Sequence, residues 1–348
     1  MNQCNKRKDN KYVSSLNQEL HSVMKSDSRV VILGEDILDP YGGAFKVTKG
    51  LSSCFPGRVF TTPISESAIV GIAVGLSMRG FYPVVEIMFG DFLALAADQI
   101  INNAAKFRWM YNDNVSVPLV VRTPMGGRRG YGPTHSQCLE KHFIGVPGLW
   151  VIAPSIVSSP GDLLRKSILD CEDPVLFIEN KTCYGKNLSD TVPDLTIEHY
   201  ADKFAPFPST LIRHNDIKPV SEGVLFCYGG MVPLCIEAVN YLRDQEGLYI
   251  NIAIFSQLSP TPETHIRHIL DKWNPKLCIY AEETSTVGGW SAEVIATVEE
   301  IQGARTTPAS MRHIRIGGKH TAIPACKELE SQTLPQVDDI VQLILNCF

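Results

Sequence analysis

Short runs of continuously apolar residues, each about as long as one buried β-strand, recur along this chain of 348 residues and constrain its fold most strongly. Stretches of helical periodicity separate them at 66–79, 91–111 and 159–170, and an amphipathic helix is expected at 12–26. Buried strands that alternate with helices are typical of a parallel, doubly wound sheet. In the first half the apolar runs are VVILGED (30–36), PVVEIMF (83–89), VPLVVRTP (117–124), LWVIAPS (149–155) and PVLFIEN (174–180).

The alternation stops between about residues 186 and 221 and then resumes. The interrupting stretch is polar, contains prolines and has weak periodicity, so we expect a linker or an excursion at a sheet edge. We therefore predict an α/β protein with two doubly wound domains, 1–195 and 222–348, joined by a linker at 196–221. The expected strands of the second domain are GVLFCYGG (223–230), YINIAIFSQ (249–257), KLCIYAEE (276–283) and MRHIRIG (311–317), with helices between them and a closing helix near 335–346.

Composition excludes several classes of function. The chain is 44% hydrophobic and 20% charged, with a net charge of −5 and no long basic tract, which gives no support for binding nucleic acid or an anionic membrane. No apolar run reaches the roughly 18 residues that a membrane span needs, and the N-terminal residues do not read as a secretory signal. The ten cysteines include no CxxC pair, so we expect reduced thiols in a cytoplasmic protein.

Ligands of open parallel sheets bind at the carboxyl ends of the strands, so the polar residues that follow each apolar run are the candidates for a site. The first is Glu66, in FTTPISESAIVGIAVG (60–75), at the start of a helix rich in Ala and Gly. A carboxylate there can be a helix cap, stabilised by roughly 0.3–1 kcal/mol through the helix dipole, or a catalytic acid. Two glycines inside this helix each cost roughly 1 kcal/mol against alanine, which suggests that another element approaches closely.

The second candidate is the loop RTPMGGRRGYGPTHSQCLE (122–140), which follows an expected strand and contains four glycines. His135 is a natural proton carrier near neutral pH, and Arg128 and Arg129 offer affinity for an anionic substrate. The alternative is a surface loop with an incidental histidine. The glycine spacing matches neither a dinucleotide-binding nor a P-loop motif.

A third group, AEETSTVGGWSAEV (281–294), places two acids at a strand end before a Gly-Gly turn. We interpret it as a structural turn rather than a site. The remaining histidines have no metal-ligand spacing.

Together with YGGAFKVTKGL (41–51), EIMFGDFLALAADQIINNAAKFRWM (86–110), PGLWVIAPS (147–155) and IPACKELESQTLPQVDDIV (323–341), these segments form an ordered series of blocks. The series resembles the beta subunit of thiamine-diphosphate-dependent 2-oxo acid dehydrogenases, the decarboxylase component of the pyruvate, branched-chain and acetoin complexes. The resemblance runs from about 30 to 345. It implies a transketolase-like pyrimidine-binding domain followed by a transketolase C-terminal-like domain.

The resemblance also implies roles for individual residues. Glu66 would share a proton with atom N1′ of the thiamine aminopyrimidine, a role that suits a carboxyl shielded from water. Met88, Phe89 and Phe92 would form the apolar wall around that ring, although plain core positions would be buried as well. His135 would handle protons on the substrate during acyl transfer to a lipoyl group.

The expected diphosphate half of the site is missing. Thiamine enzymes hold Mg²⁺ and the diphosphate with a GDG motif followed by Asn, and neither GDF (90–92) nor GDL (161–163) fits that pattern. The resemblance therefore implies an alpha subunit that binds the diphosphate and Mg²⁺, an alpha2beta2 heterotetramer, and a lipoyl acyltransferase partner in a multienzyme complex.

The chain departs from the family pattern in places. Thr134 stands where the family usually has Gln, and ILDCEDPV (168–175) is about one residue longer than the family loop that often binds a monovalent cation, which leaves that cation doubtful here.

The expected function is decarboxylation of a 2-oxo acid with transfer of the acyl group to a lipoyl carrier. The alternatives are a split transketolase-like subunit acting on a sugar phosphate, or a non-catalytic regulatory or scaffolding subunit.

Overall fold

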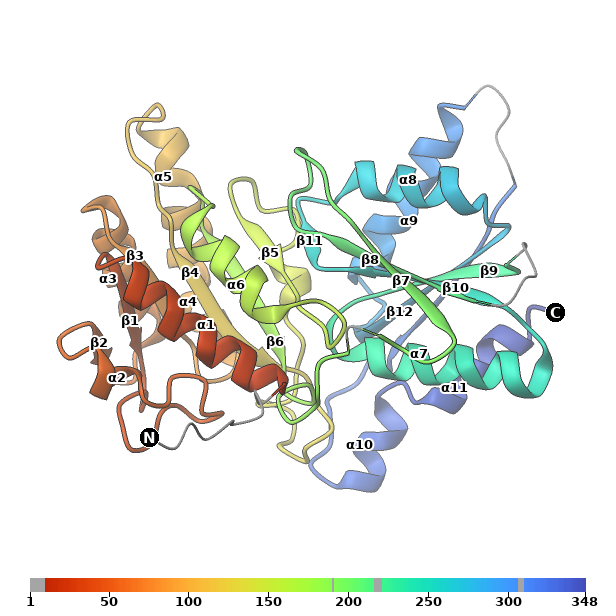
Figure 1. The fold of residues 1–348 in the computed structure, drawn as a ribbon, viewed down its shortest axis with the longest axis horizontal. Coiled ribbons are helices and arrows are strands. Elements are labelled where there is room, and N and C mark those ends of the chain that lie inside the picture. The colour runs from red at the N-terminus through yellow and green to blue at the C-terminus, as the bar shows by residue number, and fades with distance from the viewer. Residues whose placement is uncertain (1–9, 190, 216–220, 306–309) are drawn as a thin grey trace, which may run out of the picture.

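Two β-sheets, each covered by helices, make up the computed structural model of the chain (Figure 1). The structure describes residues 10–189, 191–215, 221–305 and 310–348. Red to yellow-green segments form most of the sheet at the left of Figure 1, to which β11 adds a strand from farther along the chain, and green to blue segments form the sheet at the right. None of the helices within these ranges is long and apolar enough to cross a membrane.

The first sheet has seven strands in the order β11-β5-β6-β4-β3-β1-β2. All neighbouring pairs are parallel except β11 with β5. The strands are β1 (Val30–Gly34), β2 (Val59–Thr61), β3 (Tyr82–Glu86), β4 (Val120–Met125), β5 (Trp150–Ile152), β6 (Val175–Asn180) and β11 (Gln257–Ser259). The helices are α1 (Tyr12–Ser26), α2 (Leu51–Cys54), α3 (Glu66–Met78), α4 (Leu93–Asp98), α5 (Ala105–Met110) and α6 (Pro160–Leu169), with a π-helical turn η2 (Gln99–Ala104) between α4 and α5.

The second sheet has six strands in the order β13-β12-β9-β10-β8-β7, of which the first four are mutually parallel. The strands are β7 (Leu195–Tyr200), β8 (Ser209–His214), β9 (Gly223–Cys227), β10 (Ile250–Phe255), β12 (Leu277–Ser285) and β13 (Arg312–Gly318). The helices are α7 (Val232–Tyr241), α8 (Glu263–Trp273), α9 (Trp290–Gly303), α10 (Lys327–Thr333) and α11 (Val337–Leu345). The α/β prediction of two doubly wound domains is confirmed.

Two segments differ from the simple sequence interpretation. The expected linker at 196–221 contains most of β7 and all of β8. β8 pairs antiparallel with β10, and β7 pairs antiparallel with β8 at the edge of the sheet. This stretch is therefore the edge excursion rather than a plain connection. The expected strand at 249–257 is divided: β10 stays in the second sheet, and β11 crosses to pair with β5 of the first.

A buried ionic cluster lies inside the first domain. Arg122 on β4 is 1% exposed and donates to Glu86 on β3 and to Glu179 on β6, with Nη2 to Oε2 of Glu179 at 2.6 Å. The strand register places Glu86 and Arg122 directly opposite each other. Gly43 closes over the cluster with a φ of +78°, and a Cβ there would lie 2.8 Å from a Glu86 carboxylate oxygen. Only glycine suits this position.

Replacement of Arg122 by Met should be strongly destabilising. It leaves two carboxylates buried without their cation, which typically costs about 3–5 kcal/mol. Chemical denaturation of the isolated chain measures the loss. Arg29→Met is the matched control, because the Arg29–Asp27 pair is on the surface, with an arginine side chain that is 55% exposed. Its substitution should change the free energy of unfolding only slightly, because exposed ion pairs contribute little. Equal effects of the two substitutions would contradict the buried-cluster account.

Candidate active site

Five side chains follow strands of the first sheet at one edge. Because β1, β2, β3, β4 and β6 are parallel neighbours, their carboxyl ends lie on the same side. Glu35 follows β1, Glu66 follows β2, Phe89 follows β3, His135 lies in the loop after β4, and Lys181 follows β6. Three of the predicted site residues, Glu66, Phe89 and His135, thus come from segments that follow strands at the same sheet edge.

Glu66 begins α3 and is 5% exposed. Within the described part of the chain its carboxylate accepts no hydrogen bond, and the side chain of the N-cap residue Ser65 makes none to the helix either. The first-turn amides are therefore not capped by this carboxylate. The two glycines of this helix differ in how closely another element approaches them. Gly71 lies against Gln99, where an added Cβ would be 3.1 Å from the amide oxygen, whereas the space beside Gly75 is open.

Glu35 is a second acid beside Glu66 and was not among the predicted site residues. It is 7% exposed and directly follows β1. Burial raises the pKa of the Glu35 carboxyl, and the negative charges of Glu66 and Asp36 raise it further. The sequence signal was the acid pair in GED at the end of an apolar run.

Aromatic rings surround His135. Its imidazole makes edge contacts with Phe89 and Phe92, with ring centroids 4.9 Å and 5.2 Å apart. Phe89 also contacts Phe45 and Tyr131. Met88, Phe89 and Phe92 are half-buried rather than enclosed in the core, so part of each side chain is free to face a ligand. Thr134 Oγ1 lies 3.1 Å from Nδ1 of His135 and helps to orient the ring.

The two arginines of the loop have different environments. Arg128 adopts a φ of +70°; its amide donates to Glu330 at 2.8 Å and its Nη2 to the Pro335 carbonyl, so it ties the loop to the second domain. Arg129 is exposed; its Nη2 donates to the Lys181 carbonyl at 2.8 Å, and its guanidinium carbon lies 5.9 Å from the centre of the Phe45 ring. Arg129 thus reaches the aromatic group around His135.

Lys181 and Asp91 are buried charges beside the same loop that the sequence interpretation missed. Lys181 is 0% exposed, and Asp91 is 8% exposed. Asp91 accepts from the backbone and side chain of Gln137, at 3.2 Å and 2.9 Å. The available signal for Lys181 was a cation placed directly after the apolar run PVLFIEN.

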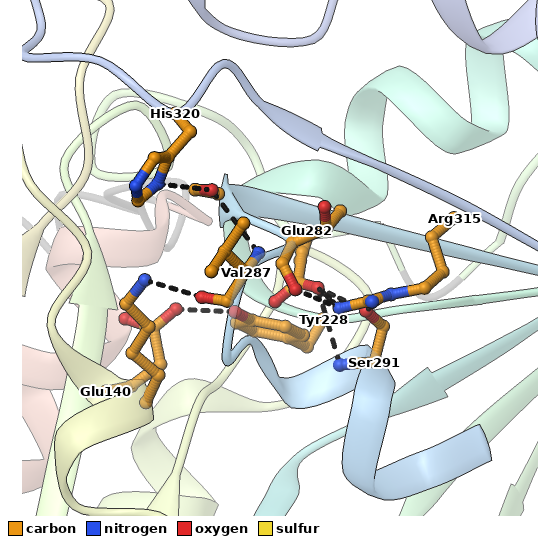
Figure 2. A network of polar contacts seen from close by, with 10 residues as sticks. Glu140, Tyr228, Glu282, Val287, Ser291, Arg315 and His320 are labelled. Carbon is orange, nitrogen blue, oxygen red and sulfur yellow. Dashed lines mark hydrogen bonds and ion pairs between the residues drawn. The ribbon is translucent and has the colours of Figure 1, made fainter.

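Figure 2 shows a buried acidic network that joins the end of the His135 loop to the second domain. Tyr228 donates to Oε1 of Glu140 at 2.5 Å, and the other Glu140 oxygen is buried without a partner in the described structure. Glu282 accepts from Ser291, with Arg315 Nη2 at 3.8 Å. Glu283 accepts from the Gly127 amide at 2.7 Å and from Asn180 at 2.8 Å. The acids of the 281–294 group therefore bind parts of the structure together, in agreement with their interpretation as structural.

Burial raises the pKa of the Glu140 carboxyl to about 7; the Tyr228 hydrogen bond opposes this shift, and Glu282 and Glu283 add to it. Since the folded pKa exceeds the ordinary value of 4.5, the native state holds an extra proton between these limits. The protonated Glu140 carboxyl favours the folded state. This contribution to the free energy of unfolding is fully present below about pH 4.5 and is lost as pH rises through about 7.

Glu140→Gln should therefore lose this pH dependence and be more stable than wild type at pH 8, by up to about 3 kcal/mol. Melting temperatures of the isolated chain at pH 5.5 and 8 test this. Glu300→Gln, at an exposed position of α9, should leave the wild-type dependence intact. An unchanged pH dependence in Glu140→Gln would show that this carboxyl ionises normally.

The chain matches two family models. Residues 9–186 match the pyrimidine-binding domain of transketolase, and residues 217–340 match its C-terminal domain. A solved structure titled as a split-gene transketolase, an inactive beta4 tetramer, superposes with a TM-score of 0.67 over 95% of this chain and 96% of that one, at 18% identity. This likeness concerns the fold alone.

Curated relatives carry more specific names. The pyruvate dehydrogenase E1 component subunit beta-2 of Oryza sativa is 34% identical, over 94% of this chain and 83% of that protein. The beta subunit of the acetoin:2,6-dichlorophenolindophenol oxidoreductase of Bacillus subtilis is 33% identical, over 95% of each. The 3-methyl-2-oxobutanoate dehydrogenase subunit beta of Mycobacterium tuberculosis is 33% identical, over 83% of this chain and 78% of that protein. Through these domains and relatives, the chain belongs to the family of beta subunits of 2-oxo acid dehydrogenase E1 components.

Proposed function

We propose that this chain supplies the aminopyrimidine-binding half of a thiamine-diphosphate site that decarboxylates a 2-oxo acid and passes the acyl group to a lipoyl carrier. The observation that carries the proposal is Glu66, a buried carboxylate that has no hydrogen-bond partner in the described protein and lies after β2, on the side of the sheet where the parallel strands end. Names of the curated relatives support this function and do not favour the sugar-phosphate or scaffolding alternatives.

The residues present fit the pyrimidine half of the cofactor. Glu66 would hold a proton at N1′, and the half-buried side chains of Met88, Phe89 and Phe92 offer an apolar wall for the ring. The bound cofactor supplies a nucleophilic carbon for attack on the 2-oxo acid. His135, within reach of Phe89 and Phe92, would move protons on the substrate, and the exposed Arg129 would attract its anionic group.

The diphosphate and Mg²⁺ would be held by an alpha subunit, as the names of the relatives as E1 beta subunits suggest. A surface for such a partner is available around α3, α4 and α5, where several large apolar side chains are exposed. Their exposed fractions are 83% for Ile64, 55% for Ile72, 62% for Leu95, 86% for Trp109 and 62% for Met110. We propose an alpha2beta2 assembly with a lipoyl acyltransferase partner, located in the cytoplasm.

The substitution Glu66→Gln distinguishes a catalytic role of Glu66 at N1′ from a purely structural role at the start of α3. The reconstituted complex should fold and bind thiamine diphosphate but exchange the C2 proton of the thiazolium slowly, because an amide cannot relay a proton to N1′. Exchange of C2–H for deuterium by NMR is the measurement. Glu293→Gln, in the first turn of α9, is the matched control for the helix-dipole contribution. Near-wild-type exchange with a lowered melting temperature in Glu66→Gln would contradict the proposal and leave a dipole role.

His135→Ala should reduce acyl transfer by roughly 10²–10⁴-fold, the usual cost of losing a general acid–base group, while cofactor binding stays close to wild type. The assay is turnover of the reconstituted complex with a lipoyl acceptor. His142→Ala, an exposed histidine in the turn Glu140–His142 at the end of the same loop, should retain activity. Activity of His135→Ala within a few-fold of wild type would show that His135 has no catalytic role.

A further inference from the structure

We propose that Lys181 is a positioning residue for His135: its buried ammonium group binds the His135 backbone carbonyl and so holds the imidazole against the aromatic wall. The inference rests on the function proposed above for His135. It assigns a role to a residue that sequence reasoning did not select.

Complete burial excludes the simpler role of Lys181 as a group that touches substrate. Lys181 is 0% exposed in the isolated chain, so its ammonium is not accessible to a ligand at the sheet edge. Burial lowers the pKa of Lys181, whereas Asp91 and Glu283 counteract that effect. Among the described residues, no hydrogen bond or ion pair joins either carboxylate to the ammonium group; Asp91 accepts from Gln137, and Glu283 accepts from Gly127 and Asn180.

The contacts of Lys181 are those of a support for the His135 loop. Nζ donates to the carbonyl oxygen of His135. It also lies 5.1 Å from the ring centre of Phe89 and 5.5 Å from that of Tyr131, within the range of cation–π attraction. Phe89 in turn contacts the His135 imidazole. One ammonium group therefore contacts both the backbone that carries the imidazole and a ring that packs against it.

The loop needs such a support at this point. Residues 126–139 form neither helix nor strand, and their ends are held by carboxylates: Glu283 binds the Gly127 amide, Glu330 binds the amides of Arg128 and Gly130, and Asp91 binds Gln137. Between 131 and 136, the Lys181 bond is the one hydrogen bond that reaches the backbone from outside the loop in the described structure.

Packing holds the imidazole ring, through Phe89 and Phe92, but leaves one side of the loop open. A cavity of about 460 Å³ lies between Pro133 and residues 136–139 of the loop and residues 318–323 of the second domain. Within the loop, the bond from the His135 amide to the Gly132 carbonyl is long, at 3.3 Å. Loss of the ammonium group should therefore free the backbone at His135 without disturbing Glu66, which lies on a different element.

The first test uses the isolated chain and does not depend on activity. Hydrogen–deuterium exchange by mass spectrometry should show roughly tenfold faster exchange at 131–137 in Lys181→Met, with peptides of α3 unchanged, as expected for loss of a local contact. Lys186→Met, at an exposed lysine five positions along the chain, is the matched control and should exchange like wild type. Unchanged exchange at 131–137 in Lys181→Met would overturn the proposal.

The second test is a double-mutant cycle in the complex reconstituted with an alpha subunit. Lys181→Met should lower acyl-transfer turnover by roughly 10–100-fold, while exchange of the thiazolium C2 proton stays at the wild-type rate. If Lys181 acts through His135, adding Lys181→Met to His135→Ala should lower acyl-transfer turnover by no more than about threefold further. Additive losses, or slowed C2 exchange, would contradict the positioning role.

Lys181→Gln keeps a hydrogen-bond donor and should recover part of the turnover lost in Lys181→Met. If Lys181→Met does not fold, Lys181→Gln takes its place, and its shorter, uncharged side chain should give intermediate acceleration of exchange at 131–137 and an intermediate loss of turnover; wild-type values of both would overturn the proposal. Absence of 2-oxo acid turnover by the wild-type complex would refute the proposed function instead, and the exchange experiment would still decide whether Lys181 holds the loop.

Discussion

Parallel pairing of β1, β2, β3, β4 and β6 is the constraint on which the rest of the structure depends. It brings the segments that follow these strands to one edge of the first sheet, although they are far apart in the chain. The same pairing buries both faces of β1, β3, β4 and β6 almost completely, so charged side chains inside the sheet need partners. The Glu86–Arg122–Glu179 cluster satisfies that need on three adjacent strands.

Buried carboxylates of the second domain bind the loop 126–139, which follows β4 of the first domain. Glu283, at the end of β12, and Glu330, on α10, bind amides of the 126–139 loop directly. Glu140, at the far end of the loop, binds Tyr228 of the second domain. Because these contacts cross between the domains, the second domain contributes to the site by fixing the loop that carries His135.

Periodicity predicted most of the fold because the parallel strands are apolar on both faces. It did not identify β7, whose exposed residues Glu198 and His199 are polar, or β8 as strands of the second sheet. Nor does an apolar run show that it is divided between two sheets, as β10 and β11 are.

In the site, the pattern of residues singled out Glu66 and His135 because each follows a strand. It treated Arg128 and Arg129 alike, since their difference arises from the Pro335 carbonyl, which is 207 positions away from Arg128. Lys181 and Glu140 were missed for the same reason: their roles depend on distant partners. The assignments of Glu66, His135, Met88, Phe89 and Phe92 stay predictions.

We propose that this chain carries half of a cofactor site. Isothermal titration calorimetry of thiamine diphosphate in the presence of Mg²⁺ tests this most directly, with the isolated chain compared against the chain combined with an alpha subunit. We expect no tight binding to the isolated chain and tight binding to the combination, because the diphosphate and metal ligands would come from the partner. Sub-micromolar binding, on the order of −8 kcal/mol or stronger, to the isolated chain would contradict it.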